Sequence, residues 1–319
     1  MQKYLVRRLL LFVPTLLGVS IGVFVLLRVI PGDVAAIILE DNYSLDSAER
    51  INAQLGLDKP IYIQYFTWIS NLVRLDLGNS IGNNRSISEM LRRQFPVTLQ
   101  LAGLTIGVVF LTAIPVGILA AVRQDSLWDY TLRSISILGI ATPSFFAGII
   151  VILVLSVYFR WIPPIGFVHL WDSPWKSSQQ LIFPALALGF TSQGLLMRIT
   201  RGQLLEVMRQ DYVRTAYAKG LAERVVILRH AVRNSLLPVV TLAGSQIGAL
   251  LSGTVAIELI FNLPGVGRAL ISAVRIRDLP VIEVYVMYFA VVVLVVNLFI
   301  DLTYGLLDPR IQYESQRGL

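Results

Sequence analysis

The segment VRTAYAKGLAERVVILRHAVRNSLLP, residues Val213–Pro238, is basic and lies between two strongly apolar runs. It carries one acid, Glu223, against five basic residues: Arg214, Lys219, Arg224, Arg229 and Arg233. Gly220 divides the segment into two helix-forming pieces, because glycine allows the sharp reversal that a pair of helices needs. A basic helical pair of this kind predicts either a surface that rests on anionic lipid or a short helix that enters a cleft on another protein.

Each piece has a predicted apolar face. In the first piece, four residues share one side of the helix: Val213, Ala216, Tyr217 and Gly220. In the second piece, a narrow apolar stripe follows at positions i, i+4, i+7 and i+11: Leu221, Val225, Leu228 and Val232. The first piece is short and rich in small residues around Thr215 and Ala216, so it has little bulk on one side.

Composition places the rest of the chain in a membrane. Of the 319 residues, 55% are hydrophobic and 15% are charged, whereas a soluble domain has about 45–50% apolar and about 25% charged residues. The net charge of +7 fits Lys and Arg on cytoplasmic loops and does not indicate nucleic-acid binding. The chain has no cysteine, and its two histidines, His169 and His230, do not have the spacing of metal ligands.

Six apolar runs are long enough, or nearly so, to cross a bilayer as helices. They are Leu9–Ile30, Val97–Val122, Ser134–Phe159, Leu181–Ile199, Leu236–Leu259 and Glu283–Leu307. The first run is 22 residues long, against about 7–15 for the apolar part of a signal peptide, so we expect it to remain as an uncleaved helix. The sequence therefore predicts an all-α integral membrane protein with six transmembrane helices.

Basic residues predict the orientation of these helices. With the N-terminus inside, segments 1–8, 123–133, 200–235 and 308–319 are cytoplasmic and hold 14 Lys and Arg in 67 residues. The segments on the other side, 31–96, 160–180 and 260–282, hold 11 in 110. The higher cytoplasmic density favours cytoplasmic N- and C-termini. Residues 1–319 then form a single transmembrane domain, with 31–96 extracytoplasmic and 200–235 a cytoplasmic loop.

Two extracytoplasmic segments have helical patterns of their own. In the first, apolar and aromatic residues recur at helical spacing, which predicts an interfacial helix or a docking surface: Tyr62, Tyr65, Phe66, Ile69, Leu72 and Val73. In the second, an apolar stripe is bracketed by turn signals: Ala269, Leu270, Ala273 and Val274. The second segment is either a plain surface hairpin or an outer gate, whose candidate residues are Glu258, Pro264, Gly265, Gly267, Arg275 and Arg277.

No part of the sequence predicts catalysis or nucleotide binding by this chain. It lacks a phosphate-binding G-x-x-x-x-G-K-[ST] loop and any arrangement of nucleophile, base and acid. Ionisable residues lie only toward the ends of the predicted spans, which argues against a proton-driven carrier. One of them, Asp301, is predicted to pair with Arg198 or Arg201 rather than to relay protons. A partner protein is therefore expected to supply the energy.

The segment after Gln210 resembles the cytoplasmic EAA loop of permease subunits in bacterial ABC importers. The runs DYVRTAYAKGL (211–221) and RHAVRNSLLP (229–238) are similar to the dipeptide/oligopeptide permease family. Further matches cover the whole chain: RRLL (7–10), PGD (31–33), LGLDKP (55–60), PGVG (264–267), RDLP (277–280) and DPR (308–310). Arg214 stands where the general pattern has Glu, and the distance from Gly220 to Pro238 is longer than in sugar importers. A contact that the Glu makes in the general family pattern is therefore not assigned to Arg214.

The resemblance implies a multi-pass permease subunit in a bacterial or archaeal inner membrane, with no catalytic residue and no metal. It also implies a homologous second permease, two cytoplasmic ATPase subunits that bind ATP and Mg²⁺, and an extracytoplasmic substrate-binding protein. The coupling contacts to the ATPase are then Asp211, Tyr212, Arg214, Thr215, Ala216, Lys219, Gly220 and Leu221. The chain itself binds no cofactor, and its non-protein partner is the lipid bilayer.

Polar residues of the last two spans are candidates for lining a pathway for di- or oligopeptides: Thr241, Ser245, Gln246, Ser252, Thr254 and Asn297. The simpler interpretation of any one Ser or Thr is a hydrogen bond between helices. Within the family, nickel, glutathione or oligosaccharides are alternative solutes. In a different class of protein, a self-sufficient channel or secondary carrier remains an alternative. Transport without an ATPase would distinguish it from an import subunit.

Overall fold

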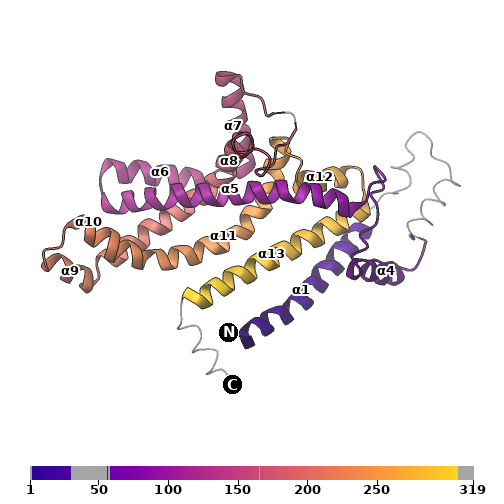
Figure 1. Cartoon of the computed structure of the whole chain (residues 1–319), viewed down its shortest axis with the longest axis horizontal. Helices are drawn as coiled ribbons and strands as arrows, with labels where there is room; N and C mark the ends of the chain where they lie inside the picture. The colour runs from indigo at the N-terminus through magenta and orange to yellow at the C-terminus, as the bar shows by residue number, and fades with distance from the viewer. Residues whose placement is uncertain (1, 30–55, 57, 165, 308–319) are drawn as a thin grey trace. The chain divides into compact units, whose positions relative to one another are not determined.

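The structure is a computed structural model that describes residues 2–29, 56, 58–164 and 166–307. All its regular elements in this part of the chain are helices, as predicted (Figure 1). They are α1 (Gln2–Val29), α4 (Ile61–Val73), α5 (Ile87–Val122), α6 (Leu127–Ala141), α7 (Ser144–Phe159), α8 (Pro174–Met208), α9 (Asp211–Ala218), α10 (Glu223–Val225), the π-helix η2 (Val226–Val232), α11 (Arg233–Ile260), α12 (Val266–Arg275) and α13 (Leu279–Leu307).

Five helices are long and apolar enough to cross a membrane. The spans are Leu10–Val29, Ile87–Val122, Pro174–Met208, Pro238–Ile260 and Leu279–Ile300. They match the predicted first, second, fourth, fifth and sixth apolar runs. The described residues therefore contain five candidate spans, or six when the bent pair α6 and α7 forms one.

The third predicted run, Ser134–Phe159, is not the continuous helix that the sequence predicted. It divides into α6 and α7, which meet at an angle of 110°. Pro143 lacks a backbone N–H and pushes the preceding residue, Thr142, into an extended conformation, so α6 ends there. Thr191 Oγ1 donates to the Thr142 carbonyl at 2.9 Å, which satisfies one acceptor near the break.

The chain folds into two compact units, which are described separately. Unit 2 comprises residues 97–263 and 296–319, and α8 is its central helix, in contact with α6, α7 and α11. The crossing of α8 and α6 is close because Gly194 faces the Ser136 carbonyl, where an added Cβ would lie only 2.4 Å from the oxygen. Ser136 Oγ also donates to the Gly194 carbonyl. Small residues at helix contacts are typical of membrane proteins.

Unit 1 comprises residues 1–96 and 264–295. Its core joins the beginnings of α5 and α13 to α12, with Ile87, Val266, Val281 and Tyr285 buried together. The Tyr285 hydroxyl donates to Gln94 Oε1 at 2.6 Å, so this large side chain is buried with its polar atom satisfied.

The helix predicted over residues 62–73 is present as α4 and packs against α1 in unit 1. Phe24 of α1 contacts the rings of Tyr65 and Trp68, and Ser20 and Tyr65 share a hydrogen bond of 2.8 Å. The predicted apolar set is divided, because Tyr65 faces α1 whereas Tyr62 and Phe66 are exposed.

Candidate functional site

Two residues separate the end of α8 from the start of α9. Helix α9 packs against the rest of unit 2 through a small apolar face. Val213 and Ala216 are buried and pack with Val226 and Val207. Their burial agrees with the predicted face of the first piece, but Tyr217, assigned to the same face, is exposed. Most of α9 is therefore accessible, including Asp211, Tyr212, Arg214 and Thr215.

The predicted turn after α9 is present at Gly220. The backbone φ of this residue is +75°, in the left-handed region that favours glycine. Its N–H donates to the Tyr217 carbonyl at 2.9 Å, and the Leu221 N–H donates to Ala216 at 3.4 Å. An added Cβ at Gly220 would meet no atom within 4 Å, so the requirement for glycine lies in the backbone conformation and not in packing.

The apolar stripe predicted for the second piece is exposed except at its last residue. Leu221, Val225 and Leu228 are exposed, and only Val232 of the predicted set is buried. The buried residues are instead Val226, Ile227, Ala231 and Val232, and the last three pack on the C-terminal parts of α5 and α8. The reason is that residues 226–232 form a π-helix, whose i→i+5 hydrogen bonds turn a different set of side chains toward the core than an α-helix would.

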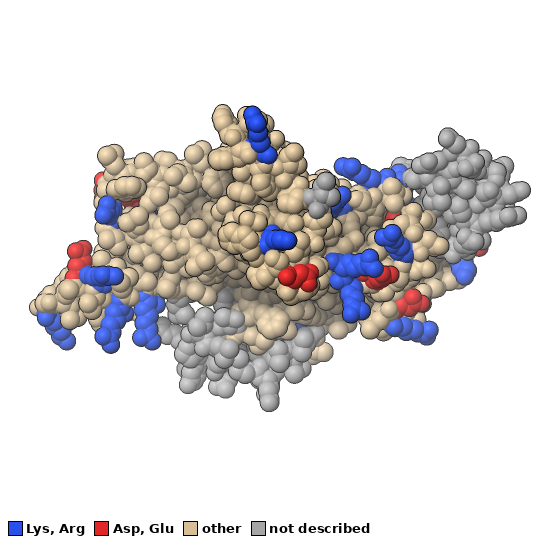
Figure 2. Space-filling view, turned by 45° about the horizontal axis from the view of Figure 1, so that its top comes forward, with Lys and Arg blue, Asp and Glu red and all other residues tan. Residues whose placement is uncertain are grey.

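The loop consequently has a mixed apolar and basic exposed surface at one end of unit 2. Tyr212, Tyr217, Leu221, Val225 and Leu228 are exposed apolar or aromatic residues on α9 to η2. Exposed basic residues accompany them: Arg214, Lys219, Arg224, Arg229 and Arg233. Figure 2 shows blue side chains gathered at the α9–α10 end of the molecule, on the left. Aromatic and Arg side chains are enriched in protein interfaces.

Two sets of polar contacts that the sequence did not predict occur in this part of unit 2, one within the loop and one between α6 and α8. Asn234 Nδ2, at the start of α11, donates to the Tyr212 hydroxyl at 3.0 Å and to the His230 carbonyl at 2.9 Å. The guanidinium of Arg201 on α8 donates to both carboxylate oxygens of Asp129 on α6, each at 2.7 Å. The first set joins the beginning of α9 to α11, and the second joins the start of α6 to the C-terminal part of α8.

The ion pair between Arg201 and Asp129 differs from the pairing that the sequence predicted. Arg201 was a predicted partner of Asp301, but in the structure its partner is Asp129, which is fully buried and also accepts from the Asp125 N–H. The side chain of Asp301 lies outside the described residues. The signal that could have found Asp129 is an acid three residues after the N-cap Ser126, whose hydroxyl accepts from the Asp129 N–H.

The candidate pathway residues do not form one cluster in the structure. Ser245 and Ser252 are exposed on α11, and Asn297 is exposed on α13. Gln246 lines a small apolar cavity with Phe110 and Leu196, and Thr241 is partly buried. Thr254 is buried and bonds to the Leu251 carbonyl of its own helix, as Ser245 does to Leu242. Pathway lining therefore remains a prediction for the exposed serines.

A short helix, α12, is present in unit 1 where the sequence showed an apolar stripe bracketed by turn signals. Pro264 and Gly265 precede it, and its buried residues are Val266, Gly267 and Ala273. The predicted stripe was wrong at Val274, which is exposed, because the core lies toward Val266 instead. Arg275 is exposed at the C-terminal end, and Arg277 follows in a left-handed turn with φ +51°. The remaining candidate gate residue, Glu258, belongs to unit 2, where it is buried and accepts from Thr98 Oγ1 at 2.7 Å.

The buried carboxylate of Asp278 holds a loop in place beside α12. It accepts from Ser80 Oγ, from the Ile81 N–H at 3.1 Å and from the Gly82 N–H at 3.2 Å. Gly82 is packed so closely that an added Cβ would lie 2.4 Å from Ile276 Cδ1. This role could not be predicted from the sequence, because Asp278 and the loop are about 200 positions apart in the chain.

Two family profiles match nearly all of this helical chain. Residues 113–313 match the binding-protein-dependent transport system inner membrane component, and residues 1–102 match the N-terminal part of such membrane components. The chain belongs to this family. It is therefore an inner-membrane transport subunit, and the predicted ABC permease assignment is confirmed. Among the described residues, no group of three or more His, Cys, Asp or Glu could hold a metal ion.

Relatives of two kinds cover this permease almost end to end. A protein named as a peptide transport system permease from Brucella abortus is 38% identical over 314 residues, which is 98% of this chain and all of the relative. The glutathione transport system permease protein GsiC of Escherichia coli strain K12 is 36% identical with the same coverage. The chain is thus a permease of the peptide/glutathione type of ABC importer, with either solute class among its relatives.

Proposed function

We propose that this chain forms half of the translocation pathway of an ATP-driven importer of di- or oligopeptides. It would pair with a homologous second permease, two cytoplasmic ATPase subunits and an extracytoplasmic binding protein. The family match to a binding-protein-dependent system supports this assembly. The peptide solute is supported by the B. abortus relative, and glutathione, which is itself a small peptide, is the second candidate because of the E. coli relative.

The observation that carries the proposal is the exposed α9 with its glycine turn. Val213 and Ala216 anchor α9 to unit 2, which leaves Tyr212, Arg214 and Thr215 available to a partner. Asn234 links α9 to the start of α11, and the buried face of η2 rests on α5 and α8. A displacement of α9 by an ATPase would therefore be passed directly to helices that contain three of the candidate spans.

The proposed cycle involves no bond chemistry in this chain. ATP-driven closure of the ATPase subunits would move α9, and the spans would change from an inward-facing to an outward-facing arrangement. The binding protein would then release solute into the pathway, and ATP hydrolysis would restore the inward-facing state. Ser245 and Ser252, exposed on α11, are the best placed of the candidate lining residues in this scheme.

Uptake assays on the reconstituted transporter test the solute. Vesicles with all subunits should accumulate labelled dipeptide when ATP and the binding protein are present, and excess unlabelled glutathione should compete only if the same pathway carries it. Nickel and oligosaccharide uptake serve as the family alternatives. Uptake of glutathione or nickel without any dipeptide uptake would contradict the peptide assignment while leaving the importer assignment in place.

A further inference from the structure

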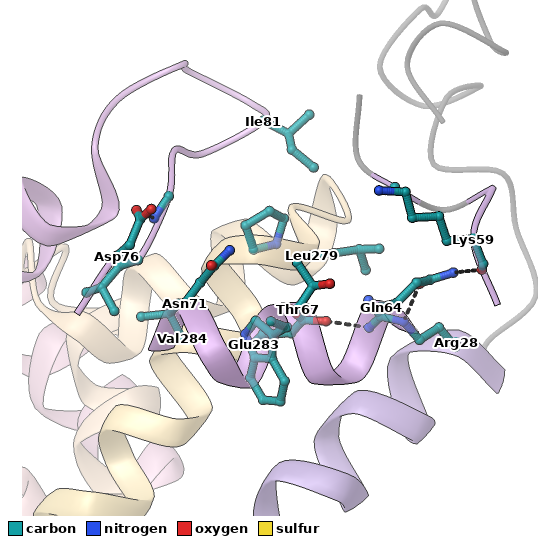
Figure 3. A pocket seen from close by; sticks show the side chains of 15 residues that line it. Arg28, Lys59, Gln64, Thr67, Asn71, Asp76, Ile81, Leu279, Glu283 and Val284 are labelled. Carbon is teal, nitrogen blue, oxygen red and sulfur yellow. Dashed lines mark hydrogen bonds and ion pairs between the residues drawn. The ribbon is translucent and has the colours of Figure 1, made fainter. Parts of the chain in front are cut away.

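A polar pocket of about 340 Å³ lies within unit 1 (Figure 3). Four parts of the chain form its wall: Arg28 near the end of α1, the polar side of α4, the loop through Asp76 and Ile81, and the first residues of α13. On α4, Gln64, Thr67 and Asn71 recur at helical spacing and line the pocket. The transport scheme above assigns no role to this pocket.

The pocket lies at the level where a membrane meets water. Arg28 is the last residue but one of the span Leu10–Val29, and Leu279 is the first residue of the span Leu279–Ile300. Because both residues line the pocket, the ends of two spans coincide there. The hydrocarbon core ends where the spans end, so the pocket is at the depth of the lipid headgroups. In the predicted orientation, this is the outer leaflet.

Exposed apolar side chains surround the polar wall. Val29 is 73% exposed at the end of α1, and Phe66 is 67% exposed on the side of α4 that does not line the pocket. Tyr62 is exposed on the same side of α4. A helix with one polar face and one aromatic, apolar face is typical of the membrane interface. A ligand with a polar head and apolar chains fits both parts of this surface.

The charges that remain available in the pocket are one cation and one anion. Arg28 is already engaged, since it pairs with Glu283, donates to Gln64 Oε1 and lies 3.5 Å from the centre of the Phe24 ring. Lys59 and Asp76 are both exposed, and Figure 3 shows them on opposite sides of the pocket. Asp76 uses Oδ1 to accept from the Gly78 N–H at 3.2 Å.

The wall residues also carry uncharged N–H groups. The indole nitrogen of Trp68, a wall residue, is buried and has no hydrogen-bond partner within the described part of the chain. Buried N–H groups without a partner are rare and call for an explanation. The amide of Asn71, also in the wall, provides another donor in the same pocket.

We infer that this pocket binds the headgroup of a zwitterionic phospholipid with a primary ammonium, that is, a phosphatidylethanolamine. The phosphate meets Lys59 and the amide of Asn71, and the ammonium meets Asp76. An ethanolamine ammonium has N–H groups to donate to a carboxylate, whereas a choline ammonium has none and a glycerol headgroup has no positive charge for Asp76. The acyl chains lie along the apolar end of α1.

Lipid retention by the purified protein tests this site. The full-length chain, with any subunits that co-purify, is exchanged into mild detergent with equal amounts of phosphatidylethanolamine, phosphatidylcholine and phosphatidylglycerol of the same acyl length. Native mass spectrometry then measures the bound lipids. Wild type should retain phosphatidylethanolamine in preference. Lys59→Ala and Asp76→Asn should each lower this retention roughly tenfold, because each removes one charge-assisted hydrogen bond.

The control is Lys176→Ala, an exposed lysine in the first turn of α8 that does not line the pocket. This variant should retain the lipid as wild type does. Asn at position 76 still accepts from the Gly78 N–H, so unchanged thermal unfolding shows that lost retention is not lost folding. Equal retention of the three lipids by wild type, or unchanged retention in both pocket variants, overturns the inference. Displacement of the lipid by soluble dialanine also overturns it, in favour of a peptide site.

Discussion

Replacing Asp129 by asparagine should destabilise unit 2 by about 3 kcal/mol. The carboxylate is fully buried and forms two hydrogen bonds of 2.7 Å to Arg201, so the substitution leaves a guanidinium without its counter-charge. Breaking a buried pair from one side costs about 3–5 kcal/mol. The lower end applies because the Arg201 side chain keeps 17% exposure and can gain some hydration. For a domain of about 150–250 residues, 1 kcal/mol corresponds to roughly 2–4 °C, so Tm should fall by roughly 6–12 °C.

Thermal unfolding of the purified chain in one detergent measures this effect. The matched control is Glu89→Gln, which removes an i,i+4 pair with Arg93 whose side chains are 57% and 73% exposed. That change should cost less than about 0.5 kcal/mol. The double variant Asp129→Asn with Arg201→Gln should recover much of the loss, because no unpaired charge remains. Two results would contradict a stabilising buried ion pair. One is a loss of unfolding free energy in Asp129→Asn no larger than in the control, and the other is a double variant whose loss equals the sum of the two single losses.

Three further variants test the other sites. Gly220→Val should strain the turn by about 1–2 kcal/mol and lower the solute imported per ATP hydrolysed; a wild-type ratio would contradict the coupling role of α9. Arg275→Glu with Arg277→Glu should weaken binding-protein stimulation of ATP hydrolysis, most clearly at low ionic strength, with subunit assembly intact; full stimulation would show that these arginines do not meet the partner. Asp278→Ala leaves three donors without their acceptor and should make the loop around Gly82 sensitive to protease; unchanged protection would remove its role as an anchor.

The sequence was sufficient for features that depend on local composition. Apolar runs of membrane length predicted the helices, because the hydrocarbon core requires about 20 consecutive apolar residues whatever they pack against. The turn at Gly220 was predictable for a similar reason, since a left-handed backbone between two helices favours glycine. The whole-chain resemblance then led to the family that the profiles confirm.

The errors occurred where packing changes the helical register or direction. The run through Pro143 is apolar throughout, so its composition does not reveal that the proline ends α6 and starts α7 at a 110° angle. Residues 226–232 were assigned α-helical spacing, but as a π-helix they bury Val226, Ile227 and Ala231 instead of Leu228. Whether a helix widens to the π form depends on what its side chains contact, and local helix propensity carries no information about those contacts.

The polar contacts of the candidate sites were also beyond sequence reasoning. Arg201 is 72 positions from Asp129, and Asp278 is nearly 200 positions from the loop that it holds. Acids are common near helix N-termini, so the position of these two acids in the sequence does not distinguish a buried partner from an exposed residue. Only the fold places their partners within hydrogen-bond distance.

ATP-dependent uptake into proteoliposomes tests whether this chain forms part of an ATP-driven peptide importer. Vesicles are prepared with this chain, its partner permease and both ATPase subunits, or with the two permeases alone, and labelled dipeptide is supplied with its binding protein. The account predicts accumulation against a gradient only when the ATPases and ATP are present, and loss of that accumulation with Gly220→Val. Dipeptide transport by the permeases alone, without nucleotide, would show a self-sufficient carrier and contradict the account.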